Sequence, residues 1–173
     1  MQDHRQWFRY LVAAFLFTGC AAQNGQGGAT VTPTRVPIIL ENLAITAGQT
    51  LFVPAYAEVH YAEGGRTIEL AVTLTIHNTD FQQSIVVTSV RYYDTQGQFV
   101  KEYLAEPLRL GPLASTDFFI GAGEQPGGIG TNFIVEWVAE TAVHEPVVEA
   151  LMLSTSGTQG ISFTSPGRVI SRR

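Results

Sequence analysis

A regular alternation of apolar and polar side chains is the feature that most constrains the fold of this chain. Residues 68–78 carry an apolar residue at every second position: Ile68, Leu70, Val72, Leu74 and Ile76. In a β-strand, side chains at a spacing of two project from the same face, whereas one face of a helix gathers positions three and four apart. This segment therefore predicts a strand that packs one face on a core and turns the other toward water.

Other segments combine β-branched and aromatic residues with turn-forming residues at their ends, which is typical of short strands. Together with 68–78, the predicted strands are residues 50–59, 84–94, 98–104, 116–121, 131–139, 147–154 and 160–164. Residues 94–97 (DTQG) have the composition of a tight turn, so residues 84–104 are predicted to form a β-hairpin. Pro54 has no backbone N–H, which places it on an edge strand or at a bulge.

Residues 147–154 leave a choice open between two structures. Glu145 and Pro146 are expected to start the segment, and its sequence VVEALMLS contains Glu, Ala, Leu and Met, which favour helix. The segment is only about two helical turns long. A strand is therefore the preferred prediction, with a helix as the alternative.

These strands predict an all-β domain, a single immunoglobulin-like β-sandwich of about seven or eight strands. Phe133, Val135 and Trp137 share one face of their strand, which marks Trp137 as a core residue. Ile134 and Val138 occupy the opposite face. This pattern suggests a strand that is buried on both sides.

The first 19 residues have the parts of a secretory signal peptide. Arg5 and Arg9 give the start a positive charge, residues 11–17 (LVAAFLF) are all apolar, and small residues follow. A membrane-spanning helix needs about 20 apolar residues, and this run is much shorter. The alternative, a buried core helix, is disfavoured because a stretch rich in Gly, Gln and Asn follows at once.

Residues 17–20 (FTGC) resemble the lipobox of bacterial lipoproteins. The resemblance implies that Cys20 carries a thioether-linked diacylglycerol and that the signal peptide is cleaved before it. Cys20 is the one cysteine of the chain, so it cannot form an internal disulfide. An incidental cysteine in an ordinary signal peptide is the alternative. Ala21 and Ala22 stand where aspartate is linked to inner-membrane retention, which implies the outer membrane, facing the periplasm, in a cell with two membranes.

Residues 20–35 are predicted to be the lipidated cysteine and a flexible linker. Residues 21–35 (AAQNGQGGATVTPTR) have no apolar periodicity and cannot bury enough surface to offset their chain entropy. The β-sandwich domain is then expected over residues 36–173, a length typical of one domain.

The charge of the chain excludes one class of partner. Asp3, Arg5 and Arg9 precede Cys20, which leaves 14 acidic and 8 basic residues from Cys20 onward, a net charge of −6. Nucleic-acid binding normally requires a basic patch, and the basic residues are scattered apart from 172–173, so no nucleic-acid partner is expected. The expected partners are the membrane, through lipid on Cys20, and an envelope protein or polymer.

The most unusual loop contains Glu124, Gly127, Gly128 and Gly130, with Asn132 close behind. Glycines let a ligand approach the backbone, so these five residues form a candidate contact loop. A phosphate-binding loop would need a lysine and a following helix, whereas a strand is predicted here. The alternative is a plain connection whose glycines serve turn geometry.

Other motifs give little support to enzymatic chemistry. His60, His77 and His144 are far apart and lack a compact metal-ligand spacing, and the sequence has no GxSxG nucleophile elbow. No metal, cofactor or catalytic residue is therefore predicted. Residues 77–80 (HNTD) could form a polar cluster at one end of the sandwich, but turn chemistry is the preferred interpretation.

Five blocks of the sequence resemble successive blocks of a bacterial lipoprotein family, the domain-of-unknown-function family 3124. The blocks are residues 51–56 (LFVPAY), 74–80 (LTIHNTD), 90–95 (VRYYDT), 127–133 (GGIGTNF) and 159–165 (QGISFTS). The resemblance covers nearly the whole predicted domain, residues 40–170. The family has no established activity, so the resemblance implies no catalytic or binding residues.

Taken together, these features predict a lipid-anchored lipoprotein of the cell envelope with a non-enzymatic binding domain. One alternative is a hydrolytic enzyme that acts on envelope polymers or small solutes, for which a deep pocket with convergent Asp, Glu or His would be evidence. Another is a structural subunit of a larger assembly. A broad apolar patch would favour binding.

Overall fold

The structure, a computed structural model, describes residues 38–124, 127–156 and 160–173. Within these ranges it has twelve β-strands and one short 3-10 helix, η1 (Leu40–Asn42). The predicted signal peptide 1–19, Cys20 and the linker to residue 35 lie outside the described residues. The all-β class predicted from the sequence is confirmed.

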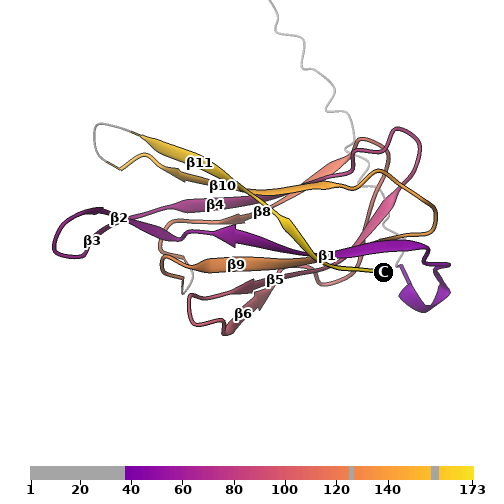
Figure 1. The fold of residues 1–173 in the computed structure, drawn as a ribbon, viewed down its shortest axis with the longest axis horizontal. Coiled ribbons are helices and arrows are strands. Elements are labelled where there is room, and N and C mark those ends of the chain that lie inside the picture. The colour runs from indigo at the N-terminus through magenta and orange to yellow at the C-terminus, as the bar shows by residue number, and fades with distance from the viewer. Residues whose placement is uncertain (1–37, 125–126, 157–159) are drawn as a thin grey trace, which may run out of the picture. The chain divides into compact units, whose positions relative to one another are not determined.

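Two antiparallel sheets face each other and form a sandwich (Figure 1). The larger sheet has the strand order β12 (Arg168–Arg172), β1 (Ala47–Ala55), β9 (Thr131–Ala139), β5 (Ile85–Tyr93) and β6 (Phe99–Glu102), and β7 (Leu108–Leu110) also pairs with β5. The smaller sheet has the order β11 (Ile161–Pro166), β10 (Val147–Ser154), β4 (Ala71–His77) and β8 (Ser115–Ile120). A separate hairpin of β2 (Glu58–Ala62) and β3 (Arg66–Glu69) projects at one end, opposite η1 (Figure 1).

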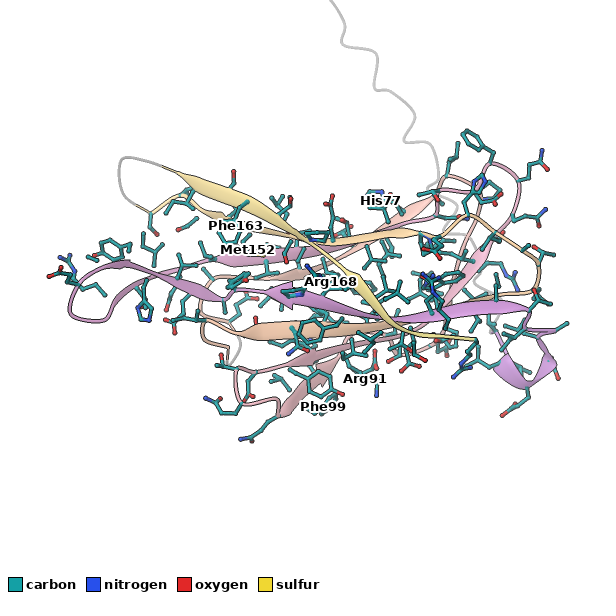
Figure 2. All side chains as sticks on the ribbon, viewed as in Figure 1. His77, Arg91, Phe99, Met152, Phe163 and Arg168 are labelled. Carbon is teal, nitrogen blue, oxygen red and sulfur yellow. The ribbon has the colours of Figure 1, made fainter. Side chains whose placement is uncertain are left out.

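Alternating residues of the smaller sheet supply half of the core. Val72, Leu74 and Ile76 of β4 are fully buried, and their partners across the sheet are buried residues of β10: Met152, Ala150 and Val148. Three of the four outward residues of β10, Leu151 among them, are exposed, and Glu149 is half-buried. Strand is therefore the correct prediction for 147–154, because only a spacing of two buries these positions together. Met152 in turn pairs with Phe163 of β11 (Figure 2).

The larger sheet confirms two further predictions. Strands β5 and β6 pair as an antiparallel hairpin, as predicted for 84–104. Trp137 is a core residue, and Phe133 and Val135 beside it are fully buried. On the opposite face of β9, Val138 is buried and Ile134 is half-buried.

Seven or eight strands proved too few, because two predicted strands are interrupted and because β7 and β12 were not predicted. Residues 50–59 divide into β1 and β2 after Ala55, and residues 68–78 divide into β3 and β4 at Leu70. The Leu70 N–H donates to the Ala57 carbonyl (2.8 Å). The chain leaves one sheet and joins another at these points while the alternation of side chains continues, so the pattern did not reveal the breaks.

Pro54 was predicted to lie on an edge strand or at a bulge. Strand β1 is an interior strand, so the edge assignment is wrong, and the irregular register of β1 lies between Thr50 and Leu51. The pairing of β1 with β12 stops at Phe52, however. Pro54 therefore has no partner in β12, and its missing N–H costs no hydrogen bond to that strand.

Strands β11 and β12 join the two sheets along one side. They follow each other through Gly167, whose N–H donates to the Val148 carbonyl (2.8 Å) of the smaller sheet. A Cβ at this position would lie 3.0 Å from that carbonyl oxygen and 3.1 Å from Cγ2 of Val53 in the larger sheet. Glycine therefore allows the chain to pass closely between the sheets.

Candidate functional site

Glu124, the first residue of the candidate contact loop, closes the turn that begins at Gly121. The Glu124 carboxylate accepts a hydrogen bond from the Gly121 N–H (2.9 Å), and the Glu124 N–H donates to the Gly121 carbonyl (3.1 Å). These contacts give Glu124 a local structural role. Asn132, at the other end of the loop, is half-buried in β9 between its cross-strand neighbours Pro54 and Tyr93.

Thr95, in the turn of the β5–β6 hairpin, joins the glycines to the rest of the domain. Its N–H (3.3 Å) and its Oγ1 (2.9 Å) both donate to the Gly127 carbonyl, and its Oγ1 also accepts from the Gly130 N–H (3.1 Å). A Cβ at position 127 would lie 2.5 Å from Cβ of Ala57. The backbone at Gly127 thus packs too closely on its neighbours for any side chain.

Gly128 is required by its backbone conformation as well as by its packing. Its φ of +96° lies in the region that favours glycine, and a Cβ there would lie 2.6 Å from Oγ1 of Thr95. Its carbonyl accepts from the Ala57 N–H (3.1 Å). Packing and backbone geometry therefore account for Gly127 and Gly128 without a ligand. The contact role of Glu124, Gly127, Gly128, Gly130 and Asn132 stays a prediction.

Alanine at position 128 is expected to destabilise the domain by about 1 kcal/mol or more, because it strains a positive φ and meets Thr95. The melting temperature should fall by several degrees. Gly130→Ala is the matched control, because a Cβ at 130 approaches Thr95 only to an ordinary contact distance of 3.4 Å. Equal melting temperatures for the two variants would contradict this account, which thermal unfolding followed by circular dichroism can decide.

The HNTD segment holds three loops together near the other end of the sandwich. The buried Asn78 side chain donates to the carbonyls of Gln83 (2.8 Å), Leu110 (3.2 Å) and Gly111 (2.9 Å), and its Oδ1 accepts from the Asp80 N–H (3.0 Å). The segment is therefore used for turn chemistry, as the sequence favoured.

Asp80 continues this network as an anion. Its carboxylate accepts hydrogen bonds from the backbone N–H groups of Gln82 (2.9 Å), Gln83 (2.8 Å) and His144 (3.0 Å). These bonds, the one from Gln82 foremost, lower the pKa of Asp80 to about 2. The carboxylate is thus ionised at neutral pH, and its oxygens accept hydrogen bonds from the loops that it connects.

Sequence reasoning missed a pocket of about 130 Å³ at the end of the sandwich where β1 begins, which we call the end pocket. Its walls come from β1, β9, β12 and the connection between β9 and β10: Ala47, Gly48, Gln49, Trp137, Val143, Glu145, Arg172 and Arg173. The signal in the sequence was Gln49, a polar residue in register with the inward-facing Leu51 and Val53.

The end pocket contains one ion pair, and Arg173 adds a further basic side chain to its lining. Glu145 forms an ion pair with Arg172. The hydrogen bond from Arg172 is the main cause that lowers the pKa of Glu145, and a hydrogen bond from the Gln49 side chain also contributes. The single carboxylate of this pocket is therefore held as an anion by a cation, an arrangement that does not favour proton transfer.

An apolar face lies on the outer side of the smaller sheet. It consists of Phe119 of β8, Leu151 and Leu153 of β10, and Ala71 and Thr73 of β4, which connect them across the sheet. Phe119, Leu151 and Leu153 are 59%, 39% and 44% exposed. A contiguous apolar group of this kind is more informative than scattered exposed residues.

The part of the chain that the structure describes lacks two other features. It contains no group of three or more His, Cys, Asp or Glu residues arranged to hold a metal ion. It also contains no helix of the length and hydropathy needed to cross a membrane.

The fold and these sites define a two-sheet antiparallel β-sandwich with an exposed apolar face and a small pocket at one end. The chain belongs to the family described as "Protein of unknown function (DUF3124)", which it matches over residues 48–170. The resemblance drawn from its sequence blocks is thereby confirmed. A comparison with curated proteins found no match.

Among solved structures, the chain is similar to the one titled "Crystal Structure of Thermotoga maritima 1070". The two sequences are 12% identical, the similarity covers 73% of this chain and 95% of the other, and the TM-score is 0.40.

Proposed function

We propose that this chain is a lipid-anchored lipoprotein of the bacterial cell envelope whose β-sandwich is a non-enzymatic binding module. The lipobox-like residues 17–20 support the anchor on Cys20, and the linker to residue 35 gives the domain reach from the membrane. In a cell with two membranes, we place it on the outer membrane, facing the periplasm. The observation that carries the binding role is the apolar face.

The composition of the apolar face indicates what it would contact. Thr73 lies between Leu151 and Phe119, so this strip across three strands has two large apolar side chains with a threonine between them. Burial of apolar area stabilises an association by about 25 cal/mol per Å² before the entropic costs of binding. The face can therefore contribute to binding by simple contact, without any chemical step.

The occupant that we propose is an envelope protein with an apolar surface flanked by basic side chains. Asp117 and Glu149 lie on either side of Thr75, one step along the strands from the apolar strip, and both are acidic. A second copy of this chain stacked on the same face would place these carboxylates near the carboxylates of the other copy, and the like charges would repel each other. Basic side chains on a partner would instead complement them.

The matched residues Phe119 and Phe99 allow a direct test. Phe99 lies on β6 of the larger sheet and is 57% exposed, close to the 59% of Phe119 (Figure 2). A photo-cross-linking amino acid at position 119 is expected to capture a discrete protein from native membranes of the source cell, and the same group at 99 is not. Mass spectrometry of the adduct identifies the captured protein.

Reversal of the two acidic charges tests whether the partner surface is basic. Combining the cross-linker at 119 with Asp117→Lys and Glu149→Lys should weaken capture, because the basic partner surface would be repelled. Equal capture at 119 and 99, or capture that is insensitive to the lysines, would reject the proposed partner. An adduct with lipid or with a second copy of this chain would reject it as well.

A hydrolytic enzyme remains the alternative from the sequence, and no observation in the described residues favours it. The end pocket has one carboxylate, Glu145, which is ion-paired with Arg172. Asp80 is engaged with three backbone N–H groups.

A further inference from the structure

Four segments of the chain meet at one end of the sandwich, which we call the η1 end. They are the segment with η1 (38–46) and the β4–β5 (78–84), β7–β8 (111–114) and β9–β10 (140–146) connections. The Thr46 N–H donates to the Ala139 carbonyl (2.9 Å), and the Leu113 N–H donates to the Asp80 carbonyl (3.1 Å). The Asp80 carboxylate also accepts from the His144 N–H (3.0 Å). These bonds hold the segments together at the end opposite the β2–β3 hairpin (Figure 1).

Large apolar side chains are concentrated at the η1 end. Five of the twelve that are exposed among the described residues lie in these four short segments: Ile39, Leu40, Ile45, Phe81 and Leu113. Phe81 and Leu113, which we call the apolar tips, belong to adjoining connections and are 72% and 61% exposed. Exposed apolar residues that gather in one place indicate a contact surface, whereas scattered ones do not.

Leu113 is held in an unfavourable backbone conformation. It is the one non-glycine residue in the described ranges with a positive φ, 56°, which costs a leucine free energy and which glycine adopts freely. It follows Pro112 in a turn that the Ala114 N–H closes on the Gly111 carbonyl (3.1 Å), at the position where glycine is usual for a positive φ. Turn geometry therefore does not account for the leucine. Its exposed side chain is also outside the core, so a role in a contact is the better explanation.

The chain enters the domain at this same end. Residue 38 is the first that the structure describes, and η1 follows it at Leu40. The predicted linker of residues 21–35, between Cys20 and this end, would span about 20 Å as a random coil. A lipid on Cys20 would therefore present the apolar tips to the membrane at a high effective concentration, where weak contacts are sufficient.

The charges of the η1 end indicate what kind of surface it can contact. None of its four segments contains a lysine or an arginine, so it has no basic patch to attract anionic headgroups. Two of its acidic residues have basic partners outside these segments: Glu140 pairs with Arg109 (3.3 Å) and Glu145 pairs with Arg172. Contact with lipid would thus depend on the apolar side chains, as in proteins that lie at the membrane interface.

We propose that the η1 end contacts the lipid surface of the membrane and inserts Phe81 and Leu113 among the headgroups. This rests on the anchor in the proposed function, because the tether brings the η1 end to the membrane. The domain then stands end-on, with the β2–β3 hairpin directed away from the lipid. The outer side of β4, β8 and β10 remains open to a protein partner in this orientation.

Quenching of tryptophan fluorescence by lipid bromine tests the contact. The full chain carrying Trp7→Phe, which leaves only the buried Trp137, is reconstituted into phosphatidylcholine vesicles with brominated acyl chains. Phe81→Trp or Leu113→Trp is then added. A side chain inserted about 5–10 Å into the interface contacts the bromine atoms, so the added fluorescence is expected to fall by about half and to shift to shorter wavelength.

Phe99→Trp is the matched control and should show neither change. Phe99 is 57% exposed and pairs with Tyr93, at the end of β5 where β9 begins, away from the η1 end. Equal quenching at 81 and 99, or no quenching at 81 in a chain that floats with the vesicles, would overturn the proposal while leaving the anchor intact. A chain that does not float would reject the anchor and this proposal with it. Stronger quenching of Phe119→Trp than of Phe81→Trp would overturn the end-on orientation.

Leu113→Gly separates a contact role from a structural one. Glycine accepts the positive φ, so the melting temperature of the chain in detergent should be no lower than that of the wild type. Quenching of Phe81→Trp in the same chain should nevertheless decrease, because one apolar tip is lost. Unchanged quenching would show that Leu113 does not contact lipid. Phe119→Glu should leave the quenching unchanged, which keeps this result independent of the proposed protein partner.

Discussion

Replacing Cys20 by alanine is expected to abolish fatty-acid labelling of this protein and to release it from the membrane. A thioether to lipid requires the cysteine sulfur, and Cys20 is the one cysteine of the chain, so no other residue can replace it. Each buried methylene of an acyl chain contributes about 0.8 kcal/mol, and two chains hold a protein far more firmly than one. The effect should therefore be close to complete.

Metabolic labelling with a fatty-acid probe, followed by separation of membrane and soluble fractions, measures both effects. Ala22→Ser is a suitable control, because it changes a neighbouring residue without removing the sulfur. The control should label as the wild type does. Equal labelling of wild type and Cys20→Ala would reject lipidation at this position, and with it the anchor in the proposed function.

Asn78→Ala is expected to lower the free energy of unfolding by about 2–3 kcal/mol, the second large effect. The substitution removes the donor that serves the carbonyls of Gln83, Leu110 and Gly111 and leaves these groups with fewer partners in a buried region. Two connections between strands, β4–β5 and β7–β8, meet at this one side chain. Asn78→Asp should be similarly harmful, because a carboxylate cannot donate and lies close to Asp80.

Urea unfolding of the full chain in detergent measures this effect as a lower midpoint with an unchanged slope. Thr79→Ala is the matched control. The Thr79 hydroxyl makes one exposed hydrogen bond, to the Glu145 carbonyl (2.8 Å), so its loss should change stability by no more than about 0.5 kcal/mol. A midpoint for Asn78→Ala no lower than that of Thr79→Ala would show that the amide does not hold the loops.

Several elements of the fold followed from local pattern alone. The alternation in 68–78 predicted the buried side chains of β4, and the same rule decided that 147–154 is a strand despite its helix-favouring residues. Turn chemistry located the β5–β6 hairpin. These features depend on residues close together in sequence, where the strand period and turn preferences act directly.

The candidate contact loop was recognisable from its glycines, but the reason for them was not. Gly127 and Gly128 approach Thr95 and Ala57, which are distant in sequence and belong to other connections. Only the folded domain brings these backbones together. The same holds for the end pocket, because Gln49 and Trp137 become neighbours only through the register of β1 with β9.

By itself, therefore, the sequence determined the class of fold, the family, most strands and the core position of Trp137, and it predicts lipid attachment at Cys20. The tertiary structure alone decided where long strands change sheets, which polar residues meet at the end of the core, and that the outer face of β4, β8 and β10 remains exposed. The physical reason is that the alternation of side chains, with a period of two residues, shows only which side chains share a face of a strand. It does not state which strand lies alongside, in which register, or whether another layer covers that face.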